Sequence, residues 1–114
     1  MPIVYLIQPC ELLGTDRYKI GRSSKDDLSR VLSYKKGTKY ILIIECDNDK
    51  LLEKLLIKKF NEDFKKIAGN EFFEGDKEDM VNCFMKIVSD YKNEIEDEIL
   101  KIPNVNWMKK YIFK

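Results

Sequence analysis

A chain of 114 residues is long enough for one domain with a single modest core, and a second domain is not expected. Hydrophobic residues make up 44% of the chain and charged residues 36%, which is typical of a globular protein and not of a disordered one. The formal net charge is +1 and there is no histidine, which excludes Ser-His-Asp and Cys-His nucleophile systems and His-ligated metal nucleases.

Two segments near the N-terminus predict an antiparallel β-hairpin. Residues 3–7 form a short apolar run that ends before Pro9, which predicts a strand buried on both faces. Alternation places three of its side chains on one face: Ile3, Tyr5 and Ile7. Residues 17–22 alternate as well, with Tyr18, Ile20 and Arg22 on one face and Arg17 and Lys19 on the other.

A short helix and a third strand are expected after the hairpin. Ser24 and Asp27 form a capping-box pattern, and Gly37 is a natural helix stop. The apolar stripe between them is Leu28, Val31 and Leu32. Residues 40–44 are apolar throughout and rich in β-branched side chains, so we predict that they form the central strand of the sheet.

Two longer helices complete the expected order. Asp47 or Asn48 caps the first, which runs until Gly69 breaks it. Its apolar stripe is Leu51, Leu52, Leu55, Leu56, Phe60 and Phe64. Residues 70–73 suggest a brief extended segment that packs two aromatic side chains, and residues 76–102 predict a long helix. The order β-β-α-β-α-(β)-α indicates an α+β domain with a small mixed or antiparallel sheet.

Other sequence features bear on the compartment. No apolar run approaches the ~20 residues of a membrane helix, so we expect no membrane span and no signal or transit peptide. The three cysteines, Cys10, Cys46 and Cys83, are odd in number and lack CxxC spacing. This pattern favours an intracellular, reducing compartment over a disulfide framework or a zinc site.

Charge is concentrated within residues 17–40, where eight residues are basic and only Asp26 and Asp27 are acidic. The basic residues are Arg17, Lys19, Arg22, Lys25, Arg30, Lys35, Lys36 and Lys39. Such a local excess fits a polyphosphate-binding surface. For the lysines, a solvated face is the simpler interpretation, because 18 of the 21 basic residues in the chain are lysine.

Val4-Tyr5 on the first strand and Lys19-Ile20-Gly21 on the second resemble the paired motifs of the GIY-YIG nuclease superfamily. The segment from Tyr18 to Ser23 is similar to the branch associated with phages and large DNA viruses, in which Lys replaces the Tyr of the second motif. Further matches follow in family order: Arg30, then Glu53 with Leu56 and Phe60, then Glu71-Phe72-Phe73. The leading Gly of the first motif is absent, and Ile57 stands where many members have His.

This resemblance implies a small three-stranded, mainly antiparallel sheet flanked by helices in residues 1–75, with a C-terminal helical extension of the same domain in residues 76–114. The implied function is Mg²⁺-dependent hydrolysis of DNA phosphodiester bonds. In the implied site Tyr5 is the general base, Lys19 tunes it, Arg22 and Arg30 hold phosphate, and Glu53 binds the metal. The residues expected to contact nucleic acid are Arg17, Lys25, Lys35, Lys36 and Lys39. We expect Glu71 to support aromatic packing.

Physical arguments for these roles also come from the residues themselves. Tyr5 is a phenol among aliphatic side chains, and nearby cations would lower its pKa and suit it as a base; the alternative is a core aromatic with a satisfied hydroxyl. Arg22 and Arg30 suggest planar forks for phosphate, although Arg30 is equally placed for an ion pair within its helix. Glu53 borders an apolar stripe, where a hard cation or the nearby helix N-terminus would favour a carboxylate.

A second function remains open. The chain could be a catalytically weak or inactive module that binds nucleic acid or a protein partner. Residues 103–114 combine aromatic and basic side chains, which suits partner binding, a cap on the core or a homodimer contact made together with the C-terminal helix. If the chain is viral, the expected location is the cytoplasm or nucleus of a host cell.

Overall fold

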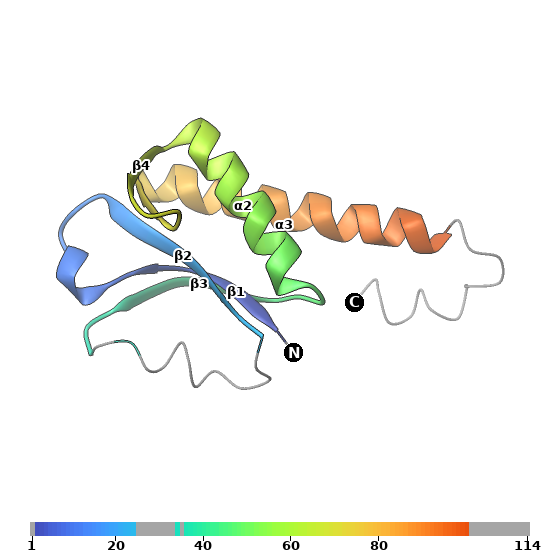
Figure 1. Ribbon diagram of the computed structural model, residues 1–114, viewed down its shortest axis with the longest axis horizontal. Coiled ribbons are helices and arrows are strands. Elements are labelled where there is room, and N and C mark those ends of the chain that lie inside the picture. Colours follow the sequence, from blue (N-terminus) through green and yellow to red (C-terminus); the bar gives the residue numbers. More distant parts are fainter. Residues whose placement is uncertain (1, 25–33, 35, 101–114) are drawn as a thin grey trace.

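The computed structural model describes residues 2–24, 34 and 36–100, which form an α+β fold (Figure 1). The elements in chain order are β1 (Ile3–Gln8), the short 3-10 helix η1 (Cys10–Leu12), β2 (Arg17–Ser23), β3 (Lys39–Glu45), α2 (Asp49–Asp63), β4 (Lys65–Ala68), β5 (Phe72–Glu74) and α3 (Lys77–Leu100). The α+β class and the long C-terminal helix are confirmed. The expected count of three strands is wrong, because the β4–β5 hairpin extends the sheet to five.

The sheet has the strand order β3-β1-β2-β5-β4, and every neighbouring pair is antiparallel. The predicted β1–β2 hairpin is confirmed, with Tyr5 opposite Gly21. The prediction that residues 40–44 form the central strand is wrong, because β3 is an edge strand. Among the described residues, Ile41, Leu42 and Ile44 of β3 pack against the core, whereas Tyr40 and Ile43 are exposed.

Helix α2 begins where its sequence predicts, since the side chain of Asn48 accepts a hydrogen bond from the backbone N–H of Leu51. Its end is earlier than predicted. Phe64 already has extended backbone, and the following residues pair with β5. The centroid of the Phe64 ring nevertheless lies 4.9 Å from that of the Phe60 ring. The apolar pattern with helical spacing therefore includes Phe64, although the helix ends before it. Gly69, with φ +54, serves the turn between β4 and β5.

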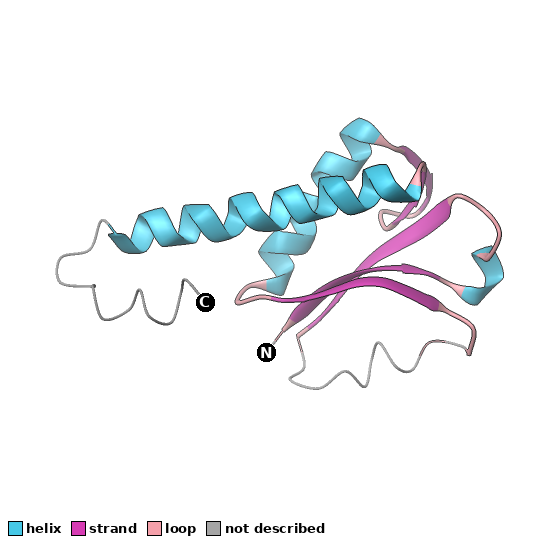
Figure 2. Ribbon diagram, turned by 180° about the vertical axis from the view of Figure 1, so that it is seen from behind, coloured by secondary structure: helices cyan, strands magenta, loops and turns pink. Residues whose placement is uncertain are grey.

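Helices α2 and α3 cover one face of the sheet and enclose the main core (Figures 1 and 2). The helices contribute Leu52, Leu56, Phe60, Met80, Phe84, Val88 and Tyr91 to it, and the sheet contributes Val4, Leu6, Tyr18, Ile20 and Phe73. Helix α3 begins at the predicted cap, because the Asp76 carboxylate accepts from the N–H of Asp79. Beyond α2 it runs past the end of the sheet (Figure 1).

The opposite face of the sheet carries a much smaller cluster. Ile3, Tyr5 and Ile7 lie together there, as the alternation predicted, and are almost fully buried. Tyr34 packs against them.

Among the residues that the structure describes, neither α2 nor α3 offers an apolar stretch long enough to cross a membrane. The helix expected after Ser24 and the segment 103–114 lie outside those residues.

Candidate functional site

A cavity of about 300 Å³ lies beside the part of β2 that follows its pairing with β5. Strand β5 pairs with Arg17–Lys19 of β2, and one further backbone hydrogen bond joins the N–H of Ile20 to the carbonyl of Glu71. Along Gly21–Ser23, no described strand pairs with β2 on that side. The cavity is lined by Tyr5, Lys19, Gly21, Arg22, Ser23, Ser24, Glu53 and Glu71. Side chains from both faces of the sheet therefore reach it around one strand.

Tyr5 reaches the cavity because the residue opposite it has no side chain. The two residues are paired across β1 and β2, and a Cβ atom added to Gly21 would overlap the Tyr5 ring. The ring thus lies against the backbone of β2, with the hydroxyl end over Gly21 at the cavity wall. The glycine of the Lys-Ile-Gly segment has a packing role that sequence spacing alone did not indicate.

Two residues of the cavity wall, Tyr5 and Lys19, are linked by a third polar side chain, that of Tyr34. The Oη atoms of Tyr5 and Tyr34 lie 2.9 Å apart, and the Lys19 ammonium donates to the Tyr34 oxygen at 3.0 Å. Lys19 Nζ also lies 3.7 Å from a carboxylate oxygen of Glu71. An ammonium only donates, so Tyr34 keeps its own proton available for Tyr5. Tyr34 was not predicted as a site residue; its only sequence signal is a place four residues after Arg30.

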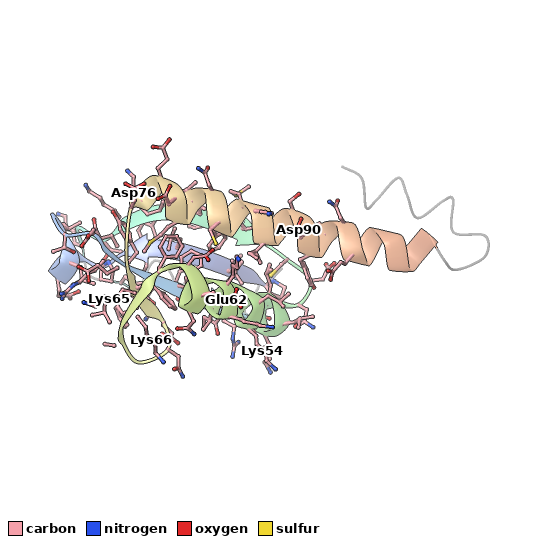
Figure 3. All side chains as sticks on the ribbon, turned by 90° about the horizontal axis from the view of Figure 1, so that it is seen from above. Lys54, Glu62, Lys65, Lys66, Asp76 and Asp90 are labelled. Carbon is pink, nitrogen blue, oxygen red and sulfur yellow. The ribbon has the colours of Figure 1, made fainter. Side chains whose placement is uncertain are left out.

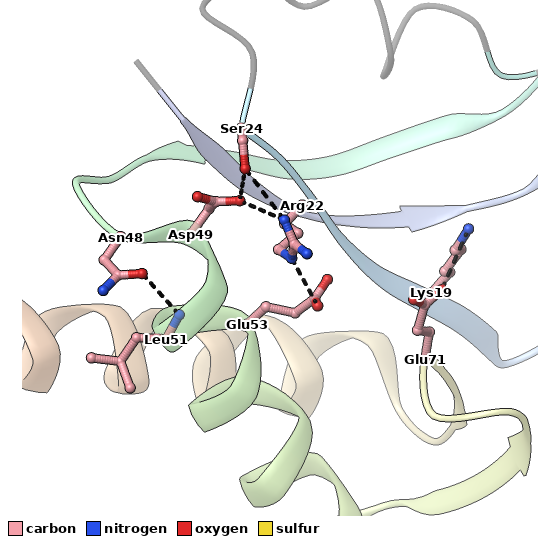
Figure 4. A network of polar contacts seen from close by, with 8 residues as sticks. All are labelled: Lys19, Arg22, Ser24, Asn48, Asp49, Leu51, Glu53 and Glu71. Carbon is pink, nitrogen blue, oxygen red and sulfur yellow. Dashed lines mark hydrogen bonds and ion pairs between the residues drawn. The ribbon is translucent and has the colours of Figure 1, made fainter.

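Arg22 approaches the cavity from the side of the helices and holds two carboxylates of α2 (Figure 4). Its Nη1 lies 2.9 Å from Asp49 Oδ2, and its Nε lies 3.4 Å from Glu53 Oε1. The Ser24 hydroxyl donates to the same Asp49 oxygen at 2.7 Å. The hydrogen bond to Asp49 raises the pKa of Arg22, and the negative charge of Glu53 acts in the same direction. The guanidinium is therefore firmly charged and remains partly exposed.

The two carboxylates that flank Arg22 differ in their environment. Burial alone would raise the pKa of Asp49, but the hydrogen bonds from Ser24 and Arg22 outweigh it and hold that pKa below its usual value. At Glu53, desolvation by burial dominates over the attraction of Arg22, so the pKa of Glu53 is raised. Asp49 is a satisfied partner that anchors Arg22, whereas Glu53 is an incompletely compensated carboxylate on the cavity wall.

With this geometry established, comparison with known proteins adds one finding. The sequence model of the T5orf172 domain matches residues 3–88. The chain belongs to this family. The T5orf172 match includes every residue that lines the cavity, and it extends into α3. T5orf172 domains occur in phage and nuclease-like proteins, which is consistent with a nuclease-like or DNA-binding module. No curated protein and no solved structure matches the chain.

The resemblance to GIY-YIG nucleases implies a divalent cation, and the carboxylates of this T5orf172 domain can be tested against that need. In the described part of the chain, no three His, Cys, Asp or Glu residues are grouped as metal ligands. Mg²⁺ commonly takes only one or two protein carboxylates, with phosphate oxygens and water completing its shell. Glu53 fits such a site because it is partly desolvated and lines the cavity, with Glu71 as the second carboxylate there. Glu71 also lies 3.7 Å from the Lys19 ammonium, and the expectation that it supports aromatic packing stays a prediction.

The predicted site residues do not all lie in the same place. Tyr5, Lys19, Arg22 and Glu53 line the one cavity. Arg30, Lys25 and Lys35 lie outside the described residues. Arg17, Lys36 and Lys39 are exposed and lie toward the other end of the sheet, since Lys39 pairs with Gln8 and Arg17 with Glu74. Figure 3 shows further lysines on the side away from α3: Lys54, Lys65 and Lys66.

Proposed function

We propose that this T5orf172 domain is a GIY-YIG-type endonuclease that hydrolyses DNA phosphodiester bonds with the help of a divalent cation such as Mg²⁺. The observation that carries the proposal is the convergence on one cavity of a phenol, an ammonium, a guanidinium and a carboxylate. Tyr5 and Lys19 come from one face of the sheet, and Arg22 and Glu53 from the other. These are the groups that phosphodiester hydrolysis requires when histidine is absent.

In this proposal Tyr5 is the general base. Its oxygen, as the phenolate, takes a proton from the attacking water while the water oxygen forms its bond to phosphorus. The hydrogen bond from Tyr34 and the positive charge of Lys19 stabilise the phenolate before the water is deprotonated. Because Tyr34 spans the gap between Lys19 and Tyr5, we assign it a positioning role.

Arg22 is proposed to bind a non-bridging phosphate oxygen and to stabilise the negative charge that develops as the bond to the leaving oxygen breaks. The guanidinium donates to Asp49 and to the Ser24 hydroxyl on one side, so its orientation is set before substrate arrives. Glu53 would hold the cation together with substrate phosphate oxygens. A bound Mg²⁺ supplies Lewis-acid stabilisation of phosphoryl charge and of the leaving alkoxide.

Nicking of supercoiled plasmid tests the proposal. The unmodified protein should nick in Mg²⁺ and not in EDTA. Glu53→Gln removes the charge at constant size and should lower the rate at least a hundredfold. Glu62→Gln is the matched control, because it makes the same change at an exposed position of the same helix and should leave the rate unchanged. Absence of cleavage by the unmodified protein, or an unchanged rate for Glu53→Gln, would contradict the proposal.

A second candidate is a domain that binds DNA without cleaving it. The ion pair between Glu53 and Arg22 favours it, because each group already has a partner of opposite charge without substrate or metal, although Arg22 offsets the desolvation of Glu53 only in part. This candidate predicts DNA binding in EDTA that weakens with salt, with log K falling by about 0.9 per phosphate contacted against log salt. It predicts no nicking in Mg²⁺, and equal or tighter DNA binding by Glu53→Gln because a negative charge is removed from the binding surface.

A further inference from the structure

A second cavity, of about 370 Å³, lies beside the first and has a different chemical character. Its lining is mostly apolar, whereas that of the first cavity is mostly polar. Phe72 and Ile67 of the β4–β5 hairpin form one side, and Pro9 and Leu12 of the β1–β2 connection contribute to the lining. Lys19 lines both cavities, so the two are neighbours that meet at this one side chain.

Aromatic rings surround the shared lysine. Lys19 Nζ lies 5.1 Å from the centroid of the Tyr34 ring and 5.5 Å from that of the Phe72 ring. Phe72 is opposite Lys19 in the β2–β5 pairing, whereas its neighbour Phe73 points into the main core and is fully buried. Phe72 is thus an aromatic side chain that the core does not use. It lies half-exposed on the face of the sheet that carries Tyr5.

The second cavity also carries charged side chains. Arg17 and Lys19 line the cavity together with one acid, Glu11. The two cavities match the two parts of a nucleotide. The first is polar and contains Arg22, the second is apolar and contains aromatic rings, and Lys19 lies between them. The phosphate suits the first and the base suits the second, because bases stack on aromatic rings and next to cations.

We propose that the second cavity takes one unstacked nucleobase of the strand whose phosphodiester occupies the first. This rests on the proposed function for the phosphate pocket. The domain should therefore prefer single-stranded or locally unpaired DNA, where a base leaves the helix stack at low cost. The predominantly apolar walls offer stacking more than hydrogen bonds to base edges, so discrimination among the four bases should be weak.

Two single-stranded probes of equal charge test the proposal: twelve thymidine nucleotides, and twelve abasic tetrahydrofuran nucleotides. Binding is measured in EDTA, so no cleavage is needed. The unmodified protein should bind the thymidine probe roughly tenfold more tightly than the abasic probe, the effect of about one stacked base. Phe72→Ala should lose most of that preference with little change in affinity for the abasic probe.

Two further variants make the result decisive. Phe72→Leu keeps apolar volume in β5 and should still fold while losing much of the preference, and Met85→Ala changes an exposed apolar residue of α3 and should keep the preference. Equal affinity of the unmodified protein for both probes, or a preference that survives in folded Phe72→Ala and Phe72→Leu, would overturn the proposal. So would self-association in sedimentation that disappears in Phe72→Leu without any base preference, because a second copy would then occupy the cavity.

The outcomes also separate this proposal from the one it rests on. Plasmid nicking in Mg²⁺ without any preference for bases would leave the nuclease proposal standing and overturn the nucleobase site. Base preference without nicking in Mg²⁺ would overturn the nuclease proposal and support the nucleobase site.

Discussion

The two faces of the sheet are built from the same strands but have different compositions. The face under α2 and α3 buries a large, almost entirely apolar core that includes Leu6, Phe60 and Phe84. On the opposite face, the buried apolar cluster of the described residues consists of Ile3, Tyr5 and Ile7, with Tyr34 packed against them. The hydroxyls of Tyr5 and Tyr34 are hydrogen-bonded to each other, and Lys19 donates to Tyr34. Strand β1 serves both, since its side chains alternate between the two.

This difference separates stability from chemistry. The first face can lose no large side chain without leaving a void, whereas the atoms for which we propose a function on the second face are hydroxyls and an ammonium, which add little to packing. The cavity at β2 is where the two meet: Arg22 and Glu53 come from the first side, Tyr5 and Lys19 from the second. Substitutions on the two faces should therefore affect different measurements.

The largest loss of stability is expected from Phe60→Ala. Phe60 is fully buried between Phe64 and Phe73, with ring centroids 4.9 Å and 5.4 Å away. Its truncation should lower the free energy of unfolding by about 3–5 kcal/mol in urea denaturation. Leu51→Ala on the same helix is the control, since Leu51 is 43% exposed and its loss should cost less than about 1 kcal/mol. Similar losses for both would show that α2 does not anchor the core.

Gly21→Ala should lower both stability and cleavage, unlike substitutions that affect one face alone. The added methyl group would overlap the Tyr5 ring and push it from its place, which should cost about 1–3 kcal/mol and abolish most cleavage. Gly14→Ala is the matched control for the loss of stability. Gly14 has φ +82 and open space around it, so alanine should cost about 1–2 kcal/mol by backbone strain alone. Its nicking rate should be retained. Equal nicking rates for the two variants would contradict the account of Gly21.

Asp49→Asn should have a smaller effect that depends on pH. Because the pKa of Asp49 is lower in the folded state than in the unfolded chain, its contribution is present at neutral pH and is lost as pH falls below about 4. We expect Asp49→Asn to lower the free energy of unfolding by about 1–2 kcal/mol at pH 7, and the difference from the unmodified protein to shrink toward pH 3. Asp90→Asn, at an exposed position of α3, is the control.

Glu53 should affect stability in the opposite direction to Asp49. Its pKa is raised in the folded protein, so its ionisation opposes folding at neutral pH. Glu53→Gln should therefore leave the thermal midpoint unchanged or slightly higher. A marked fall would mean that Glu53, like Asp49, mainly serves the fold.

Much of this architecture was predictable from local pattern. Alternation gave the faces of β1 and β2, and the caps at Asn48 and Asp76 gave the helix starts, because both signals act within a few residues. The edge position of β3 and the end of α2 were not predictable in this way. They depend on which distant segment supplies hydrogen bonds, as when Lys65 and Lys66 pair with β5.

The candidate site was predictable only in part. Tyr5, Lys19, Arg22 and Glu53 carried motif spacing and meet at one cavity. Asp49 and Tyr34 were not predicted as members of this site, because their relation to Arg22 and Tyr5 exists only after the chain folds. The second cavity likewise arises from two hairpins that are distant in sequence.

The most direct test of the central claim, that the two faces supply one catalytic site, is a double-mutant cycle in the nicking assay. Tyr5→Phe and Glu53→Gln should each lower the rate at least a hundredfold, with thermal midpoints close to that of the unmodified protein. If both residues act on the same transition state, the double variant should be little slower than the worse single variant, as for residues that act as a unit. Losses that simply multiply in the double variant, or cleavage that survives either single change, would contradict the account.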